Sequence, residues 1–195
     1  MDKKKYKLVL FDFFGVICCE ISPFWLARRF ESEKAKEIKK SIVGSADNGD
    51  ISEREMFIRL SNATGVDPDT ILKEWMEDAK INKGVLSLID ELKEQGYTIG
   101  LLSNAPPDFE QRILDRDNLY PYFKNIYISS VYKLAKPDPK FFFLALDEMG
   151  FKPEETLFVD DNPINIEAAK NIGITPILFK SAEQAKEEIL NILHS

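Results

Sequence analysis

Histidine and cysteine are scarce in this sequence, and each scarcity excludes a class of function. The one histidine, His194, stands beside the final residue, so we expect chemistry that does not depend on histidine. The two cysteines, Cys18 and Cys19, are adjacent, which suits neither a disulfide framework nor the spacing of a metal site. We interpret them as reduced, small hydrophobic residues.

Positive charge and long hydrophobic runs are scarce as well. Lys and Arg number 26 against 33 Asp and Glu, and this net charge of -7 argues against binding nucleic acid through overall attraction. The apolar run behind the basic "MDKKKYK" covers only Leu8 to Phe11, so we expect no signal peptide, no membrane span and a cytoplasmic location. A length of 195 residues fits one domain, or one domain with an insertion.

What the sequence does contain is an alternation of helices and short apolar strands. Helices are predicted over 84–96, 139–150 and 162–173 and from Ser181, and strands over 8–11, 97–103, 156–160 and 174–179. Gly96, Gly150 and Gly173 end three of these helices, while Asp138 and Asn162, each followed by proline, begin two. This alternation predicts an α/β fold, a Rossmann-like parallel sheet with helices on both faces.

Residues 20–80 interrupt this alternation because they contain no convincing strand. They predict a helix from Ser22 that could continue to Gly44, a second after the capping-box sequence "SERE" at 52–55, and a third from Asp67. We therefore expect an α/β core formed by residues 1–17 and 81–195, with an inserted α-helical cap formed by residues 18–80.

Polar side chains follow the predicted strands in a regular order. They are Asp12, then Ser103 and Asn104, then Lys133 and Lys136 before a helix, and finally Asp160, Asp161 and Asn165. Ligands bind beyond the carboxyl ends of parallel strands, so we expect these groups to form one site. Carboxylates suit Mg²⁺, hydroxyl, amide and ammonium groups suit a phosphoryl group, and a free carboxylate could act as a nucleophile. The neighbouring Asp160 and Asp161 would repel each other unless a cation neutralised them.

Four segments, "FDFFGV", "LLSN", "AKPDP" and "VDDNPIN", resemble the motifs of the haloacid dehalogenase (HAD) superfamily, and the resemblance covers nearly the whole chain. The helical insertion resembles the small cap of the family's first subclass. The resemblance implies a Mg²⁺-dependent phosphatase that acts on a small phosphorylated metabolite through an aspartyl phosphate on Asp12. It also implies phosphate binding by Ser103, Asn104 and Lys136, and metal binding by Asp12, the Phe14 backbone carbonyl, Asp160 and Asp161.

The sequence departs from the family pattern at Phe14, where family phosphatases have a second aspartate that serves as general acid and base. A general acid contributes roughly 10² to 10⁴ in rate, and phenylalanine cannot transfer a proton. We therefore favour a phosphatase for leaving groups that need little protonation, such as anomeric, acyl or aryl phosphates. Family branches resembling glucose-1-phosphate phosphatases also lack this aspartate. Glu20 could supply a proton instead, although we interpret it as an exposed hinge residue.

Two other functions stay open at this stage. A metal-independent dehalogenase also has an aromatic residue at this position, but Phe14 lacks the tyrosine hydroxyl of that branch, and the acidic pair speaks for a metal. A non-enzymatic phosphate-binding protein is the other alternative. The sequence identifies neither the substrate nor the oligomeric state, which we expect to be a monomer or a homodimer.

Overall fold

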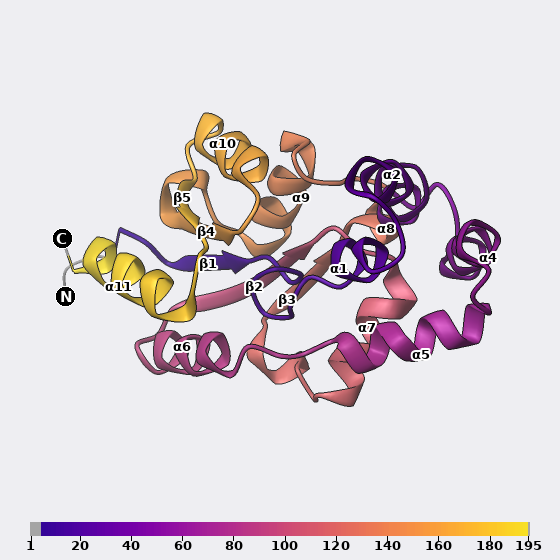
Figure 1. Cartoon of the computed structure of the whole chain (residues 1–195). Helices are drawn as coiled ribbons and strands as arrows, with labels where there is room; N and C mark the ends of the chain where they lie inside the picture. The colour runs from indigo at the N-terminus through magenta and orange to yellow at the C-terminus, as the bar shows by residue number, and fades with distance from the viewer. Residues whose placement is uncertain (1–4, 195) are drawn as a thin grey trace.

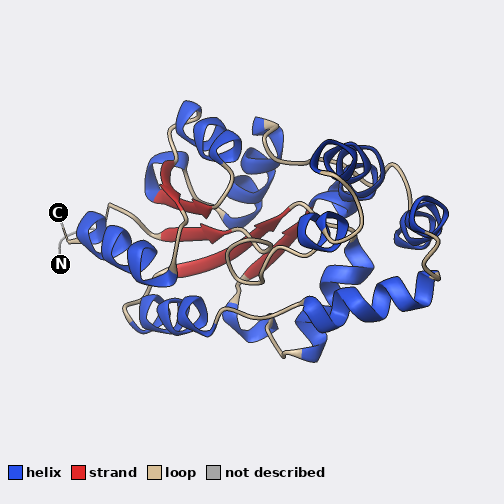
Figure 2. Cartoon of the chain, in the orientation of Figure 1, coloured by secondary structure: helices blue, strands red, loops and turns tan. Residues whose placement is uncertain are grey.

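The computed structural model describes residues 5–194, and a five-stranded parallel sheet forms its centre (Figure 1, Figure 2). The strands are β1 (Leu8–Phe11), β2 (Thr98–Ser103), β3 (Asn125–Ile128), β4 (Thr156–Asp160) and β5 (Thr175–Leu178). Their order across the sheet is β3-β2-β1-β4-β5. β1 is therefore the central strand, and Leu10 pairs with Gly100 of β2 and Phe158 of β4. The predicted Rossmann-like α/β fold is confirmed.

Both faces of the sheet are covered by helices, because alternate side chains of each strand point to opposite sides. Val9 and Phe11 join one hydrophobic cluster, whereas Leu8 and Leu10 join another. The first face is covered by α6 (Lys83–Glu94), α7 (Pro107–Arg116) and α11 (Ala182–Leu193), and the second by α9 (Pro139–Met149) and α10 (Pro163–Asn171) (Figure 1). Short helical segments lie at Tyr120–Tyr122 (η2), Ser129–Tyr132 (α8) and Pro153–Glu155 (η3).

Between β1 and α6 the regular structure is helical. The elements are α1 (Ser22–Ala27), α2 (Ser32–Ile38), the π-helical η1 (Lys39–Val43), α3 (Gly44–Asp47), α4 (Glu53–Thr64) and α5 (Pro68–Asp78). Their aromatic side chains continue the core of the first face, since the Trp75 ring lies 5.4 Å from Phe57 and 5.5 Å from Phe109 of α7. The position of these helices matches the predicted insertion. Its exact limits and its role as a cap stay predictions.

Most helix ends are formed by the residues that the sequence indicated. The side chains of Ser52 and Asp67 accept hydrogen bonds from the backbone N–H groups of Glu55 and Thr70, at 3.2 and 3.1 Å. The Glu55 carboxylate, which the capping-box sequence would direct to the Ser52 N–H, pairs instead with Arg59 at 2.7 Å. The two N-cap contacts depend only on neighbouring residues, which is why the sequence could predict them.

Two features of the fold differ from the sequence prediction. β3 was not predicted, because "NIYI" is a four-residue edge strand without a long apolar run. The single helix considered from Ser22 to Gly44 is interrupted after Ala27 and resumes at Ser32. Near the interruption, the Arg29 guanidinium lies 3.8 Å from the Trp25 ring and pairs with Glu74 of α5 at 2.6 Å. The helix is thus interrupted where Arg29 pairs with Glu74, a residue distant in the sequence. Among residues 5–194, no helix is long and apolar enough to cross a membrane.

Candidate active site

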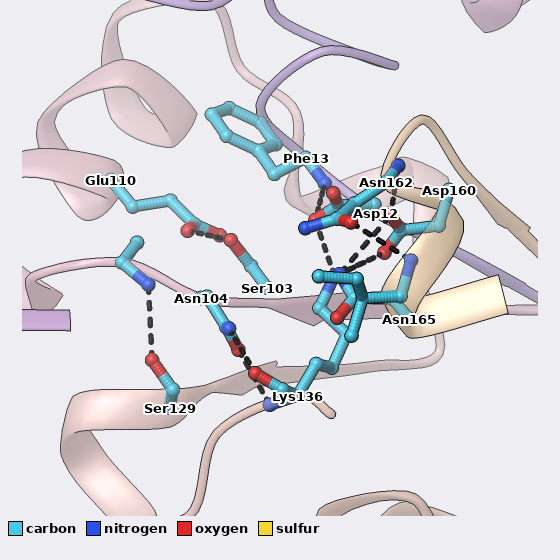
Figure 3. A network of polar contacts seen from close by, with 12 residues as sticks. Asp12, Phe13, Ser103, Asn104, Glu110, Ser129, Lys136, Asp160, Asn162 and Asn165 are labelled. Atoms are coloured by element: carbon cyan, nitrogen blue, oxygen red, sulfur yellow. Dashed lines mark hydrogen bonds and ion pairs between the residues drawn. The ribbon is translucent and has the colours of Figure 1, made fainter. Parts of the chain in front are cut away.

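Three charged side chains meet at the carboxyl edge of the sheet. Asp12 directly follows β1, Asp160 ends β4, and Lys136 lies in the loop before α9. The Lys136 Nζ atom lies 2.7 Å from Asp12 Oδ1 and 2.8 Å from Asp160 Oδ2 (Figure 3). The Lys136 side chain is 1% exposed and that of Asp12 is 11% exposed, so the nucleophile candidate is the more accessible of the two. The Lys136 ammonium group therefore forms ion pairs with both carboxylates.

Neighbouring amides fix the positions of these charges. Asn104 Nδ2 donates to the backbone carbonyl of Lys136 at 2.7 Å, and the Lys136 backbone N–H donates to Asn104 Oδ1 at 2.9 Å. The Asn165 amide donates to Asp160 Oδ2 at 3.0 Å, and the backbone N–H of Asn162 donates to Asp160 Oδ1 at 2.8 Å. Asn104 thus orients the lysine loop through its backbone, and α10 orients Asp160.

The charges of this cluster do not cancel. Burial and the charge of Asp160 raise the pKa of Asp12 well above its usual value, against the lowering effect of Lys136. Burial acts to lower the pKa of Lys136, but the charges of Asp12 and Asp160 outweigh it, and that pKa lies above its ordinary value. Burial, followed by the charges of Glu20 and Asp160, raises the pKa of Asp161 to about 6. Three carboxyl groups therefore lie around one ammonium group, and a further cation bound among them would favour their ionised forms.

The donor set fits a hard divalent cation. Carboxylate oxygens of Asp12, Asp160 and Asp161 all lie within 4.8 Å of one another. Oxygen ligands of this kind suit Mg²⁺. Gly15, with a φ of +89°, makes room for the third carboxylate, because a Cβ atom there would lie 2.4 Å from Asp161 Oδ2. No described contact tests the backbone carbonyl of Phe14 as a ligand, so that assignment stays a prediction.

Phe13 and Phe14 anchor the loop that carries Asp12. Phe13 is fully buried, and its backbone N–H donates to Asp12 Oδ1 at 2.7 Å. The Phe14 ring is stacked on Phe109 of α7, with centroids 6.1 Å apart and planes 11° apart. The residue that replaces the expected general acid is therefore a packing residue that joins this loop to α7.

A cavity of about 350 Å³ borders the charged cluster. Its lining includes Asp12, Lys136 and Asp161 of the cluster, and also Glu20 and the residues Lys39 and Asp47 from the helical insertion. A smaller chamber of about 70 Å³ adjoins it, and the two share the residues Phe14, Glu20, Lys39, Asp47 and Asn104. The chamber is otherwise mostly apolar, with Ile21, Val43, Trp75, Pro106 and Phe109 in its wall.

Two predicted site residues do not reach this cavity. Lys133 is exposed at the end of α8, in a left-handed backbone conformation with φ of 53°. Ser103 is fully buried, and its hydroxyl donates to Glu110 Oε2 of α7 at 2.5 Å (Figure 3). The structure thus brings together Asp12, Asn104, Lys136, Asp160, Asp161 and Asn165, while the Ser103 hydroxyl is engaged elsewhere.

Three residues of this region were not indicated by the sequence: Lys39, Asp47 and Glu110. Lys39 belongs to the charged run "KEIKK", which is typical of a solvated helix face, yet it is half-buried and lies 3.7 Å from Glu20. Glu110 follows the exposed Asp108 by two positions, and no local pattern separates the buried acid from the exposed one. Only the packing of α7 against the sheet distinguishes them.

The parallel sheet and its acidic edge define an α/β protein with a candidate site built from carboxylates and one lysine. The family model for haloacid dehalogenase-like hydrolases matches residues 6–173, so the chain belongs to that family. The predicted superfamily is confirmed.

The individual relatives within this family are only distantly similar to the chain in sequence. The chain is 27% identical over 141 residues to phosphoglycolate phosphatase 1 of Pseudomonas aeruginosa, covering 70% of this chain and 48% of that protein. It is 31% identical over 107 residues to glyceraldehyde 3-phosphate phosphatase of Pyrococcus furiosus, covering 54% and 45%. The chain therefore spans less than half the length of these curated relatives. A solved HAD family enzyme from Bacteroides thetaiotaomicron, the wild-type protein in complex with magnesium and inorganic phosphate, has a TM-score of 0.74 and 26% identity, and the match covers 90% of this chain and 95% of that one.

Proposed function

We propose that this hydrolase is a Mg²⁺-dependent phosphatase of a small phosphorylated metabolite, with Asp12 as the nucleophile. The observation that carries the proposal is the Asp12 carboxylate, which is 2.7 Å from the Lys136 ammonium and borders a cavity of about 350 Å³. The phosphatase relatives, and the Bacteroides enzyme with its magnesium and phosphate, support the same chemistry.

In the proposed reaction, the Asp12 carboxylate attacks phosphorus, and the bond to the leaving oxygen breaks with its electron pair on that oxygen. Water then attacks the resulting aspartyl phosphate and releases inorganic phosphate. Lys136 stabilises negative charge beside Asp12, and Asn104 holds the lysine loop in place. Mg²⁺ held by Asp12, Asp160 and Asp161, with the Phe14 carbonyl, would neutralise the charge of the phosphoryl oxygens.

The leaving group is the part of the substrate that the site constrains most. Phe14 offers no proton, and the cavity beside it continues into a chamber of about 70 Å³ with a mainly apolar wall. A compact leaving group of low basicity fits both properties, which favours aryl, acyl and anomeric phosphates over simple alkyl phosphates.

An activity screen tests the proposal. Aryl, acyl, sugar and alkyl phosphates are assayed with Mg²⁺ and with EDTA, for the wild type and for Asp12→Asn, which has nearly the same shape but is a poor nucleophile. We expect turnover with Mg²⁺ that both EDTA and Asp12→Asn abolish. Halide release from a haloacid without metal, with no turnover of any phosphate, would establish the dehalogenase alternative instead. Phosphate binding without turnover would support a non-enzymatic protein.

A further inference from the structure

Lys39 brings a positive charge from the helical insertion to the cavity that contains Asp12. It is the first residue of η1, and it borders both the cavity of about 350 Å³ and the adjoining chamber of about 70 Å³. Asp12 and Lys136 border the cavity, and Trp75 and Phe109 border the chamber. A substrate with its phosphoryl group at Asp12 and its leaving group in the chamber would therefore pass Lys39.

The charge of Lys39 is only loosely compensated by neighbouring acids. The Lys39 Nζ atom lies 3.7 Å from Glu20 Oε2, which is longer than a hydrogen bond. Burial raises the pKa of Asp47 well above its ordinary value, although the charge of Lys39 acts to lower it. This environment favours the neutral form of Asp47, which takes up little of the lysine charge. The donors of the ammonium group are thus available to a bound anion.

The proposed reaction needs a cation at this place. Phe14 cannot transfer a proton, so the leaving oxygen keeps the electron pair of the broken bond and departs as an anion. The wall of the chamber is mainly apolar, and negative charge is unfavourable there without a charged or polar partner. An ammonium group at the junction of cavity and chamber stabilises that charge without any proton transfer.

We propose that Lys39 is a catalytic residue that stabilises the negative charge of the unprotonated leaving group. The inference rests on the proposed function, because it requires phosphoryl transfer to Asp12. As the bond between phosphorus and the leaving oxygen breaks, Lys39 pairs with the resulting aryloxide or carboxylate and keeps its own proton. The product takes a proton from water after release. This role favours aryl and acyl phosphates over anomeric phosphates, because a sugar oxygen is too basic to leave readily as an anion.

The test uses phenyl phosphate and a series of its fluorinated derivatives, because fluorine lowers the basicity of the leaving oxygen with little change in size. Values of kcat and KM are measured for the wild type, Lys39→Met and Lys39→Arg. We expect Lys39→Met to lose at least about tenfold in kcat for phenyl phosphate and less than about threefold for the most fluorinated member. The rate should thus depend more steeply on leaving-group basicity. Lys39→Arg retains the charge and should keep a dependence close to that of the wild type.

A separate measurement excludes an indirect effect on metal binding. The charge of Glu20 contributes to the raised pKa of Asp161, so loss of the neighbouring Lys39 could alter Mg²⁺ affinity. Each variant is therefore titrated with Mg²⁺ and assayed at saturation. A residual metal effect would lower the rates of all substrates equally, and so would leave the dependence on basicity unchanged.

Lys40→Met is the matched control, because it removes the next lysine of the same segment, whose side chain is exposed. It should retain the wild-type rates for the whole series. Equal losses for all members in Lys39→Met, or wild-type rates in that variant, would overturn the inference, and urea unfolding shows whether the variant is folded. If the wild type hydrolyses no phosphate in the presence of Mg²⁺, the proposed function itself fails, and the role of Lys39 fails with it.

Discussion

At the scale of single residues, we expect Phe14 to determine which leaving groups the proposed phosphatase can expel. Phe14→Asp restores a carboxyl group at this position and should raise kcat for alkyl phosphates by up to about 10²-fold, with a smaller gain for aryl phosphates. The reason is that an alkoxide needs a proton to leave and a phenolate needs one much less. Kinetic assays of a matched alkyl and aryl pair measure the difference.

Phe14→Asn is the control for this change, because it removes the same ring without adding an acid. Both variants lose the stacking on Phe109, so both should be less stable by about 1 kcal/mol or more. Equal gains for alkyl and aryl phosphates, or a gain in Phe14→Asn as well, would mean that proton transfer does not limit the wild type.

The buried carboxyl group of Glu110 should make the stability of the folded protein depend on pH. Its pKa is about 8 in the folded protein against a reference value of 4.5, so the folded state binds more protons than the unfolded state between these values. The contribution of Glu110 to stability must therefore fall as pH rises from about 4.5 to about 8. Glu110→Gln removes this loss, and its stability relative to wild type should increase over the same window by a few kcal/mol, at about 1.4 kcal/mol per pKa unit.

Urea unfolding of both proteins across this pH range measures the effect. Glu53→Gln serves as the comparison, because the pKa of Glu53 is raised by burial while Arg112 acts to lower it. Parallel stability curves for wild type and Glu110→Gln would show that Glu110 is already ionised at low pH in the folded protein.

At the scale of elements, the turn after β1 has room for Asp161 only because residue 15 is glycine. In Gly15→Ala the new Cβ atom would clash with the Asp161 carboxylate, so the carboxylate must move and the proposed metal site must change. We expect Mg²⁺ affinity and activity to fall at least about tenfold. Titration of activity with Mg²⁺ measures this loss.

Gly65→Ala is a matched control for the backbone. Gly65 also has a positive φ, +74°, but a Cβ atom there would contact nothing within 4 Å. It should lose about 1 to 2 kcal/mol of stability through backbone strain and keep its Mg²⁺ affinity. A similar Mg²⁺ affinity in both alanine variants would contradict the assigned role of Gly15.

The sequence predicted those elements whose signals are local. The N-caps Asp67 and Asp138 and the helix end at Gly150 depend on residues within one turn, and all three form as predicted. Likewise, Asp12 follows the buried strand β1 and Asp160 ends the buried strand β4, and parallel pairing brings strand ends to one edge. The edge strand β3, the interruption after α1 and the contact of Ser103 with Glu110 depend on packing between distant segments. No local pattern contains that information.

At the scale of the whole molecule, the insertion and the sheet share one core and one cavity. Aromatic rings continue from Trp25 through Trp75 to Phe109 and Phe14, and the last of these is two residues from Asp12. Lys39 and Asp47 of the insertion border the same cavity as Lys136. A substrate in this cavity would therefore contact both parts of the chain at once.

The acidic cluster also links metal binding to the stability of the whole molecule. Three carboxyl groups face one ammonium group, so bound Mg²⁺ should relieve repulsion in the folded state, where the ligand atoms lie within 4.8 Å of one another. At Mg²⁺ concentrations about 100 times Kd, linkage gives about 2.7 kcal/mol, which corresponds to a rise in Tm of about 5 to 10 °C for a chain of this size. Asp161→Asn should raise the Tm of the metal-free protein, because one repelling charge is gone, and should reduce the Mg²⁺-induced shift. Calorimetric scans with Mg²⁺ and with EDTA measure both effects, and an unchanged Mg²⁺ shift in Asp161→Asn would remove Asp161 from the metal site.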